Sequence, residues 1–309
     1  MEHISVLKNE ALEGLNLKPN GHYVDCTLGG GGHASAILHA IPKGHLYAFD
    51  QDPFARKYAQ DVLAAIGSNF TIIAENFKHF DAALNTLNVD TVDGVLYDLG
   101  VSSFHFDDPS RGFSYRHDAR LDMRMNPDDA TDAYHLVNHA SEQELKTMLY
   151  RYGEESYAPS IAKNILKARA QKPIETTFEL VDIVKASMPQ KKLRQKGHPA
   201  KQTFQALRMA VNQELEVLET SLSQAAQRLA VGGRLVVITF HSLEDRLVKH
   251  LFKALATIDH PKELVTMPTE EADFHVVTRK VIVPSEDELQ MNPRAKSAKL
   301  RILERIKKS

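Results

Sequence analysis

The sequence predicts an α/β protein whose doubly wound parallel sheet is interrupted by an inserted, all-helical domain. Over the first hundred residues, apolar runs of period two alternate with runs of helical period. A glycine-rich turn follows the first strand, at the position where such folds bind a cofactor. After the strand that ends near Asp98, the next clear strand begins only at Gly233, whereas a parallel crossover needs about a dozen residues. A second domain therefore has to lie between them.

The predicted elements of the first hundred residues form a β-α-β-α-β-α-β series, which is typical of a parallel sheet with helices on both faces. Strand patterns occupy 22–25, 46–50, 70–74 and 92–97, and helical patterns occupy 34–40, 53–66 and 78–87.

The turn at 25–33 reads Asp-Cys-Thr-Leu-Gly-Gly-Gly-Gly-His and connects a strand to a helix. Glycine suits a tight turn with positive φ and lets the backbone approach a ligand closely. The plain alternative is a flexible turn without a ligand. Four consecutive glycines after an acid favour a nucleotide-cofactor site that includes Gly31, Gly32 and His33.

The turn does not by itself identify the cofactor, since Gly29-x-Gly31-x-x-Ala34 also fits dinucleotide binders. Asp50, at the end of the second strand, suits the ribose hydroxyls of NAD and S-adenosylmethionine alike. Asp25 favours a cofactor with a free amino group, because two carboxylates near a pyrophosphate would repel it. We therefore expect S-adenosylmethionine first and NAD second.

Acidic residues stand at or just past the ends of all four early strands: Asp25, Asp50, Glu75 and Asp98. A single acid at such a place could be a helix cap. Four along one edge indicate a ligand site, because open α/β sheets bind ligands at the carboxyl ends of their strands.

The inserted domain is expected at 110–205, between sheet-domain segments 1–109 and 206–309. Its pattern is helical, with capping boxes at Ser141-x-x-Glu144 and Thr176-x-x-Glu179. From Phe204 to Leu229 apolar residues recur every three or four positions, which predicts one long helix or two in line. A helix at 243–255 and strands at 274–283 and 298–303, forming a closing hairpin, complete the chain.

Positive charge is concentrated in the insert. Residues 110–205 hold 16 Lys and Arg against 12 Asp and Glu, or +4, although the whole chain has −2. The stretch 185–201 contains no acid and carries Lys191, Lys192, Arg194 and Lys196. A charge run is often only a solvated face. Beside a cofactor domain it also suits contact with the phosphates of a ligand.

Residues 111–116 interleave cations with aromatic side chains, namely Arg111, Phe113, Tyr115 and Arg116. Stacking on an unpaired base is one interpretation, and ordinary core aromatics are the other. His135 and His139 are spaced i, i+4 on a predicted helix, but no third ligand is evident, so no metal site is expected.

Composition predicts an ordinary cytoplasmic protein. The chain has 309 residues, 43% hydrophobic and 25% charged, with no leader-like start and no long apolar segment. Its single cysteine, Cys26, allows no internal disulfide.

Ten further motifs, spread from end to end, together resemble the bacterial ribosomal RNA small-subunit methyltransferase H family. They are Ile4 to Glu10, Gly31-Gly32-His33, Asp98 to Ser103, Arg111 to Ser114, Leu121 to Met125, Gly153-Glu154-Glu155, His198-Pro199-Ala200, Phe204 to Arg208, Phe240 to Arg246 and Asn292-Pro293-Arg294.

The resemblance implies a class I (Rossmann-like) methyltransferase fold that uses S-adenosylmethionine to methylate the N4 amine of a cytosine in the decoding region of 16S ribosomal RNA. It implies the small ribosomal subunit as partner, with no membrane or DNA partner. Carried over by motif, the cofactor residues are Gly31, Gly32, His33, Asp50, Phe77, Asp98 and His105, to which our own argument adds Asp25. The family usually has Gln where this chain has His105, so the role of that side chain is open.

A cytosine amine is a poor nucleophile, so orienting it toward the methyl group is most of the catalysis. The loop at Asp98 is expected to accept its N–H bonds, with His241 and Ser242 as a second wall. A non-catalytic assembly factor with a vestigial methyltransferase fold, or an NAD-dependent oxidoreductase, are the alternative functions.

Overall fold

The computed structural model describes residues 5–100, 108–257 and 272–307. The chain divides into two compact units. The first, here called the sheet unit, consists of residues 1–100 and 215–309, and the second, the helical unit, consists of residues 101–214. The helical unit thus begins before residue 110 and ends after residue 205, the limits expected from the sequence.

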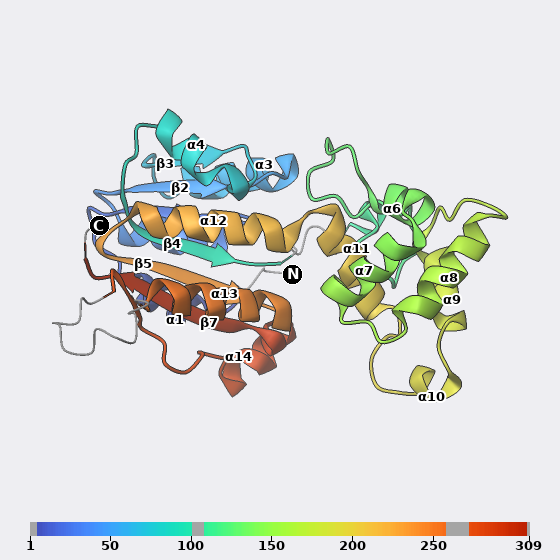
Figure 1. Ribbon diagram of the computed structural model, residues 1–309. Helices are drawn as coiled ribbons and strands as arrows, with labels where there is room; N and C mark the ends of the chain where they lie inside the picture. Colours follow the sequence, from blue (N-terminus) through green and yellow to red (C-terminus); the bar gives the residue numbers. More distant parts are fainter. Residues whose placement is uncertain (1–4, 101–107, 258–271, 308–309) are drawn as a thin grey trace, which may run out of the picture. The chain divides into compact units, whose positions relative to one another are not determined.

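The sheet unit is built on seven strands in the order β3-β2-β1-β4-β5-β7-β6 (Figure 1). The first five pair in parallel, whereas β7 is antiparallel to both β5 and β6. The predicted class of fold is confirmed. The strands are β1 (His22–Asp25), β2 (His45–Phe49), β3 (Phe70–Ile73), β4 (Val92–Asp98), β5 (Leu229–Thr239), β6 (Phe274–Val276) and β7 (Lys299–Arg305).

Two hydrophobic cores lie on opposite faces of this sheet, because successive side chains of a strand point to opposite faces. Along β1, Tyr23 joins one core and Val24 the other. Figure 1 shows α12 and α13 across the face of the second core. The helices of the unit are α1 (Lys8–Leu15), α2 (Gly32–Ala40), α3 (Pro53–Ala64), α4 (Phe80–Thr86), α12 (Glu214–Arg228), α13 (Ser242–Leu255) and α14 (Glu286–Met291), with 3-10 turns at η1 (Phe77–His79) and η3 (Pro293–Ser297).

The helical unit has its own hydrophobic core, to which apolar faces of most of its helices contribute. The two predicted capping boxes are present, with Ser141 and Thr176 as the N-caps of α7 and α9. Its elements are η2 (Pro109–Arg111), α6 (Ala133–His139), α7 (Glu142–Gly153), α8 (Ala158–Arg169), α9 (Thr177–Ala186), α10 (Gln190–Leu193) and α11 (Lys201–Val211).

Two boundaries differ from the sequence prediction for clear physical reasons. The pattern from Phe204 to Leu229 is two helices, because Gln213 has φ 49° and interrupts the backbone hydrogen bonding between α11 and α12. The two closing strands are antiparallel neighbours, but α14 and η3 lie between them in the chain, so they are not a simple hairpin. In the part of the chain that the structure describes, no helix is long and apolar enough to cross a membrane.

Candidate functional site

The candidate site lies at the carboxyl ends of β1 and β4, where the strand order of the sheet reverses. Successive strands of the chain run outward from β1 to β3, and the sheet then continues from β4 on the other side of β1. Open α/β sheets bind ligands in the crevice at such a switch point. Asp25 ends β1 and Asp98 ends β4, so both acids stand at this place.

The glycine turn after β1 has the backbone that the sequence predicted. Gly29 has φ 49° and Gly31 has φ 77°, a region that glycine enters without the steric cost other residues meet. A Cβ on Gly32 would collide with Ser5 Oγ, so the helix that starts there packs closely against the N-terminal segment. The turn therefore leads directly into the N-terminus of α2, whose amide groups favour electronegative ligand atoms.

Asp50 connects the turn after β1 to the turn after β2. Its Oδ2 accepts a hydrogen bond of 2.8 Å from the Gly29 amide, and its Oδ1 accepts one of 2.8 Å from the Asp52 amide. Bonds to a carboxylate are stronger than neutral ones and fix its plane. Asp50 is thus positioned before any ligand arrives.

Asp25 is almost inaccessible, with 1% of its surface exposed. Burial raises its pKa to about 6, although His33 and the Thr27 amide favour the ionised form. Thr27 Oγ1 accepts a 2.7 Å bond from the Asp98 amide and donates to Asp25 Oδ1 at 3.3 Å. The hydroxyl of Thr27 therefore ties the ends of β1 and β4 together.

His33 lies between these acids with both ring nitrogens facing acceptors. Its Nε2 is 3.0 Å from the Val6 carbonyl oxygen, and its Nδ1 is 3.4 Å from Asp98 Oδ2. A neutral imidazole has only one N–H, so both contacts are favourable only when the ring carries two protons. Burial lowers the pKa of His33, but Asp98 and Asp25 outweigh it and raise the pKa above its ordinary value. One imidazolium between two carboxylates leaves the site with a net negative charge.

Asp98 also offers an acceptor for a ligand. Its Oδ1 is buried and has no hydrogen-bond partner among the residues described. A buried acceptor without a partner costs roughly 1 to 3 kcal/mol until a donor reaches it. The site therefore fits a cofactor that carries a cation and N–H or O–H donors, as S-adenosylmethionine does, better than a pyrophosphate.

Three further residues were considered from the sequence, Phe77 and His105 as cofactor contacts and Cys26 as a core residue. Phe77, in η1, is half-buried and packs edge-on against Tyr97, with ring centroids 5.5 Å apart. His105 lies outside the described residues. Cys26 is buried beside the site, and burial raises the pKa of its thiol, so it is a poor nucleophile.

His241 is a helix cap rather than a free catalytic base. Its Nδ1 accepts a 3.3 Å bond from the Glu244 amide, and Glu244 Oε2 accepts from the amides of Phe240 and His241 in return. Its Nε2 is 2.9 Å from Glu244 Oε1, at an angle that makes no hydrogen bond. Ser242, the first residue of α13, is exposed. We no longer assign His241 a direct catalytic role.

Among the aromatic and cationic residues at 111–116, the two aromatic side chains pack in or against the core of the helical unit. Phe113 is 5% exposed and packs in the core, so we do not propose it as a surface for base stacking. Tyr115 is half-buried and stacks on His198, with centroids 4.2 Å apart and planes at 9°. Arg116 is exposed and remains a candidate for RNA contact.

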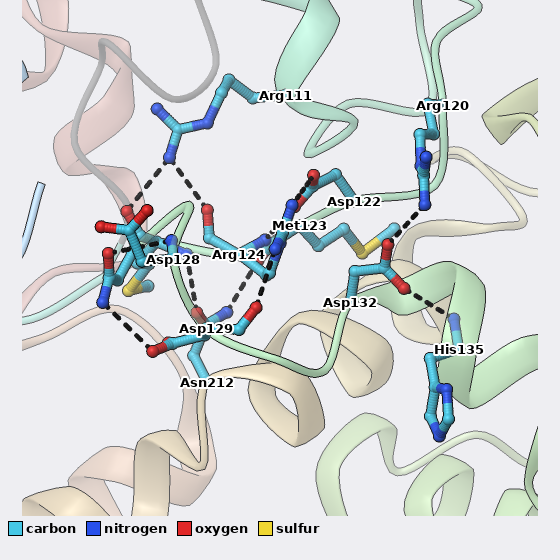
Figure 2. Close-up of polar contacts among 12 residues, drawn as sticks. Arg111, Arg120, Asp122, Met123, Arg124, Asp128, Asp129, Asp132, His135 and Asn212 are labelled. Atoms are coloured by element: carbon cyan, nitrogen blue, oxygen red, sulfur yellow. Dashed lines mark hydrogen bonds and ion pairs between the residues drawn. The ribbon is translucent and has the colours of Figure 1, made fainter.

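Arg111 has a structural role in the network drawn in Figure 2. Its Nη2 donates to the carbonyl oxygens of Arg124 at 2.9 Å and Met125 at 3.0 Å. Arg124 in turn pairs with Asp122 through two parallel bonds of 2.8 and 2.7 Å, and Asn212 accepts from the Met125 amide. Arg111 and Arg124 thus make hydrogen bonds that hold the segment 111–125 in its fold. The contact of Asn212 with this segment could not be predicted from the sequence.

Four of the six basic residues of the stretch 185–201, the ones proposed for RNA contact, lie at the surface. Lys191, Arg194 and Lys196 are exposed and Lys192 is half-buried, on and just after the short helix α10. No carboxylate among the described residues pairs with any of the four, whereas Lys185 pairs with Asp182 at 3.8 Å. These side chains can therefore reach a ligand without first breaking an ion pair.

The strand order, the glycine turn and the acids at the switch point define a class I methyltransferase. The model of the MraW methylase family matches residues 1–306, and the chain belongs to that family. It is a methyltransferase whose cofactor is S-adenosylmethionine. The NAD-dependent oxidoreductase considered from the glycine pattern is therefore wrong.

The chain is similar to curated relatives along almost its whole length. It is 52% identical to the ribosomal RNA small subunit methyltransferase H of Limosilactobacillus fermentum, covering 99% of this chain and 98% of the relative. It is 51% identical to the protein of that name in Exiguobacterium sibiricum, covering 100% and 99%, and 49% identical to that of Streptococcus pyogenes, covering 99% and 98%.

Proposed function

We propose that this protein transfers a methyl group from S-adenosylmethionine to the exocyclic N4 amine of a cytosine in the decoding region of 16S ribosomal RNA. The observation that carries the proposal is the full-length similarity to relatives that are named as small-subunit ribosomal RNA methyltransferases. The choice of the amine rests on the chemistry of the site and on the resemblance noted from the sequence motifs.

The cofactor supplies an electrophilic methyl group on a sulfonium, and the chain's residues hold and orient the two reactants. We propose that Asp50 accepts hydrogen bonds from the ribose hydroxyls, since its carboxylate is already fixed by the Gly29 and Asp52 amides. The group formed by Asp25, His33 and Asp98 has a net negative charge, which attracts the cationic methionine part of the cofactor. Cofactor binding would then use charge that the folded protein already holds in place.

The target amine needs orientation more than a strong base, because its lone pair is delocalised into the ring and its proton becomes acidic once the methyl group is attached. We propose that Asp98 Oδ1 accepts one N–H of that amine, which supplies the donor this buried oxygen lacks. A base in a stacked helix could not reach the site, so the cytosine must be unpaired and turned out of its stack.

The state of the Cys26 thiol argues against methylation of the ring carbon C5. C5 methylation normally proceeds through a thiolate adduct, and burial holds this thiol protonated. A non-catalytic assembly role is less well supported, because the chain retains the acids and glycines that we propose for the cofactor site.

The test is to incubate the enzyme with labelled S-adenosylmethionine and undermethylated small subunits, digest the RNA, and identify the labelled nucleoside by mass spectrometry. We expect N4-methylcytidine. Because phosphate contacts position an RNA without selecting a base, assembled small subunits should be better substrates than naked RNA fragments. Label on a ring carbon, on a ribose hydroxyl, or on no nucleoside would overturn the proposal.

A further inference from the structure

We propose that a groove between α6 and α7 of the helical unit is a second RNA site, which holds a single-stranded nucleotide of the substrate other than the reacting cytosine. This inference rests on the proposed function, since it names where a flanking part of the same substrate binds. It also accounts for His135 and His139, whose spacing stood out in the sequence but which the cofactor site does not use.

The groove is a cavity of about 470 Å³ with walls from both helices. That volume is within the usual range of small-ligand sites, roughly 300 to 1,000 Å³. One wall is formed by α6, and the other by α7 from Gln143 to Tyr152. Nine residue steps of a helix span about 13 Å, which is enough for one or two nucleotides.

The α6 wall carries two adjacent imidazoles. His135 and His139 are both exposed, with ring centroids 4.8 Å apart and planes at 38°. The backbone amide of His135 donates to Asp132, and Figure 2 shows its ring directed away from that bond. Neither ring bonds to another side chain in the described segments. The two rings are therefore available for stacking on a base.

The α7 wall is charged at both ends. Arg151, in the last turn, lies over the Tyr152 ring at 5.1 Å and offers a cation next to an aromatic face. Glu144, in the first turn, has a lowered pKa because it accepts the Ser141 amide, so it is ionised at neutral pH. A nucleotide matches this arrangement, with its phosphate at Arg151 and an exocyclic amine of its base toward Glu144.

A metal ion fits the groove less well. No third His, Cys, Asp or Glu in the described part of the chain brings a ligand atom within 4.8 Å of both histidines. The half-buried Leu136 and Met148, which complete the lining, suit the flat apolar face of a base better than a hydrated ion. Stacking of bases on aromatic side chains is the usual way in which proteins hold unpaired RNA.

The experiment compares the binding of undermethylated small-subunit RNA and its methylation in four proteins. They are the wild type, the double variant His135→Ala/His139→Ala, the stacking-retaining variant His135→Phe/His139→Phe, and His250→Ala as a matched exposed histidine on α13. The Ala pair should bind RNA roughly tenfold more weakly, since one stacked base is worth about 1 to 3 kcal/mol. The Phe pair and His250→Ala should bind as the wild type does.

The Ala pair should have a raised KM for RNA, with unchanged kcat at saturating RNA and unchanged affinity for S-adenosylmethionine, because the two histidines contact neither reactant at the reacting atoms in this proposal. Arg151→Ala should reduce the log-log salt dependence of RNA binding by about 0.7. Wild-type RNA affinity and KM in the Ala pair would overturn the inference, and so would equal weakening in the Ala and Phe pairs. Failure of the wild type to methylate RNA would instead contradict the proposed function, which the direct binding assay distinguishes.

Discussion

The sequence pointed to two charged regions, the acids at the strand ends of the sheet and the cations of the stretch 185–201. The structure shows that their side chains differ in burial and in hydrogen bonding. Asp25 and Asp50 are held by backbone amides, and Asp25 is almost fully buried. Lys191 and Arg194 are exposed and have no carboxylate partner among the described residues. The acids are therefore fixed before a ligand binds, whereas no ion pair with a described residue holds these cations in place.

This difference determines how each region responds to conditions. Interactions of buried charges are weakly screened, so the affinity for the cofactor should depend little on salt. Exposed cations act mainly by releasing counterions from RNA, so their contribution should fall steeply as salt rises. Three measurements test the contrast.

The largest effect is expected from Asp50→Ala. Two charge-assisted bonds to the ribose are worth about 3 kcal/mol or more, so the affinity for S-adenosylmethionine should fall on the order of a hundredfold. The Gly29 amide also loses its acceptor, which adds to the loss. Calorimetric titration measures the affinity, with Asp90→Ala, an exposed acid of the same unit, as control. If Asp50→Ala and Asp90→Ala bind the cofactor equally, Asp50 is not in the site.

The second effect concerns stability and pH in the protein without its cofactor. Because the pKa of Asp25 rises from 3.8 to about 6 on folding, the folded state binds more protons between these values, and stability falls as pH rises through them. The loss should approach about 3 kcal/mol above pH 6, at 1.36 kcal/mol per pKa unit. His33, whose pKa is also raised, adds a loss of the same sign only above pH 6.5.

Urea unfolding of the wild type and of Asp25→Asn at several pH values from 4 to 6 measures this contribution. The variant should lack the decline, so the difference in unfolding free energy between the two proteins should change across the window. Carboxylates with lowered pKa, such as Asp245, act in the opposite direction but equally in both proteins. A constant difference between the two curves would show that Asp25 does not change its protonation on folding.

The smallest effect per residue is expected from the stretch 185–201. Replacing Lys191, Lys192 and Arg194 with Ala should lower the log-log salt slope of RNA binding by about 0.7 to 0.9 for each lost phosphate contact. Affinity for S-adenosylmethionine should not move. Lys249→Ala/Lys253→Ala, on the exposed face of α13, is the control. A triple variant whose slope equals that of the control would mean that these cations form only a solvated face.

The elements of the sheet were predictable because local periodicity determines them. Strands β1 to β4 begin or end within one residue of the predicted limits, and both capping boxes of the helical unit are present. The helix α1 was missed, since it has eight residues and starts after Leu7 in a left-handed conformation rather than after a polar cap. His241 as an N-cap was also missed, because histidine is not one of the usual capping residues.

The sequence predicted which charged residues lie at the candidate site, but not which of them contact one another. The sequence placed Asp25, Asp50 and Asp98 at strand ends, where the structure has them. It could not show that His33 faces Val6 and Asp98 at once, because that contact joins three distant segments. The sequence also could not show which side chains are buried. Phe113 was predicted to stack on a base because its neighbours are cations, but it lies in the core of the helical unit.

The position of the helical unit in the chain also affects how the protein folds. The strand β4 ends at Asp98, and its neighbour in the sheet, β5, begins only at Leu229. Their pairing therefore closes a very long loop. The entropy lost on closing a loop rises only with the logarithm of its length, by about 0.6 kcal/mol per doubling, but contacts between distant residues slow folding. Residues 108–214 have a core of their own, which can collapse first and shorten the effective loop. The sheet can then be completed late, after the helical unit, with β5 as the strand that joins the two halves of the chain.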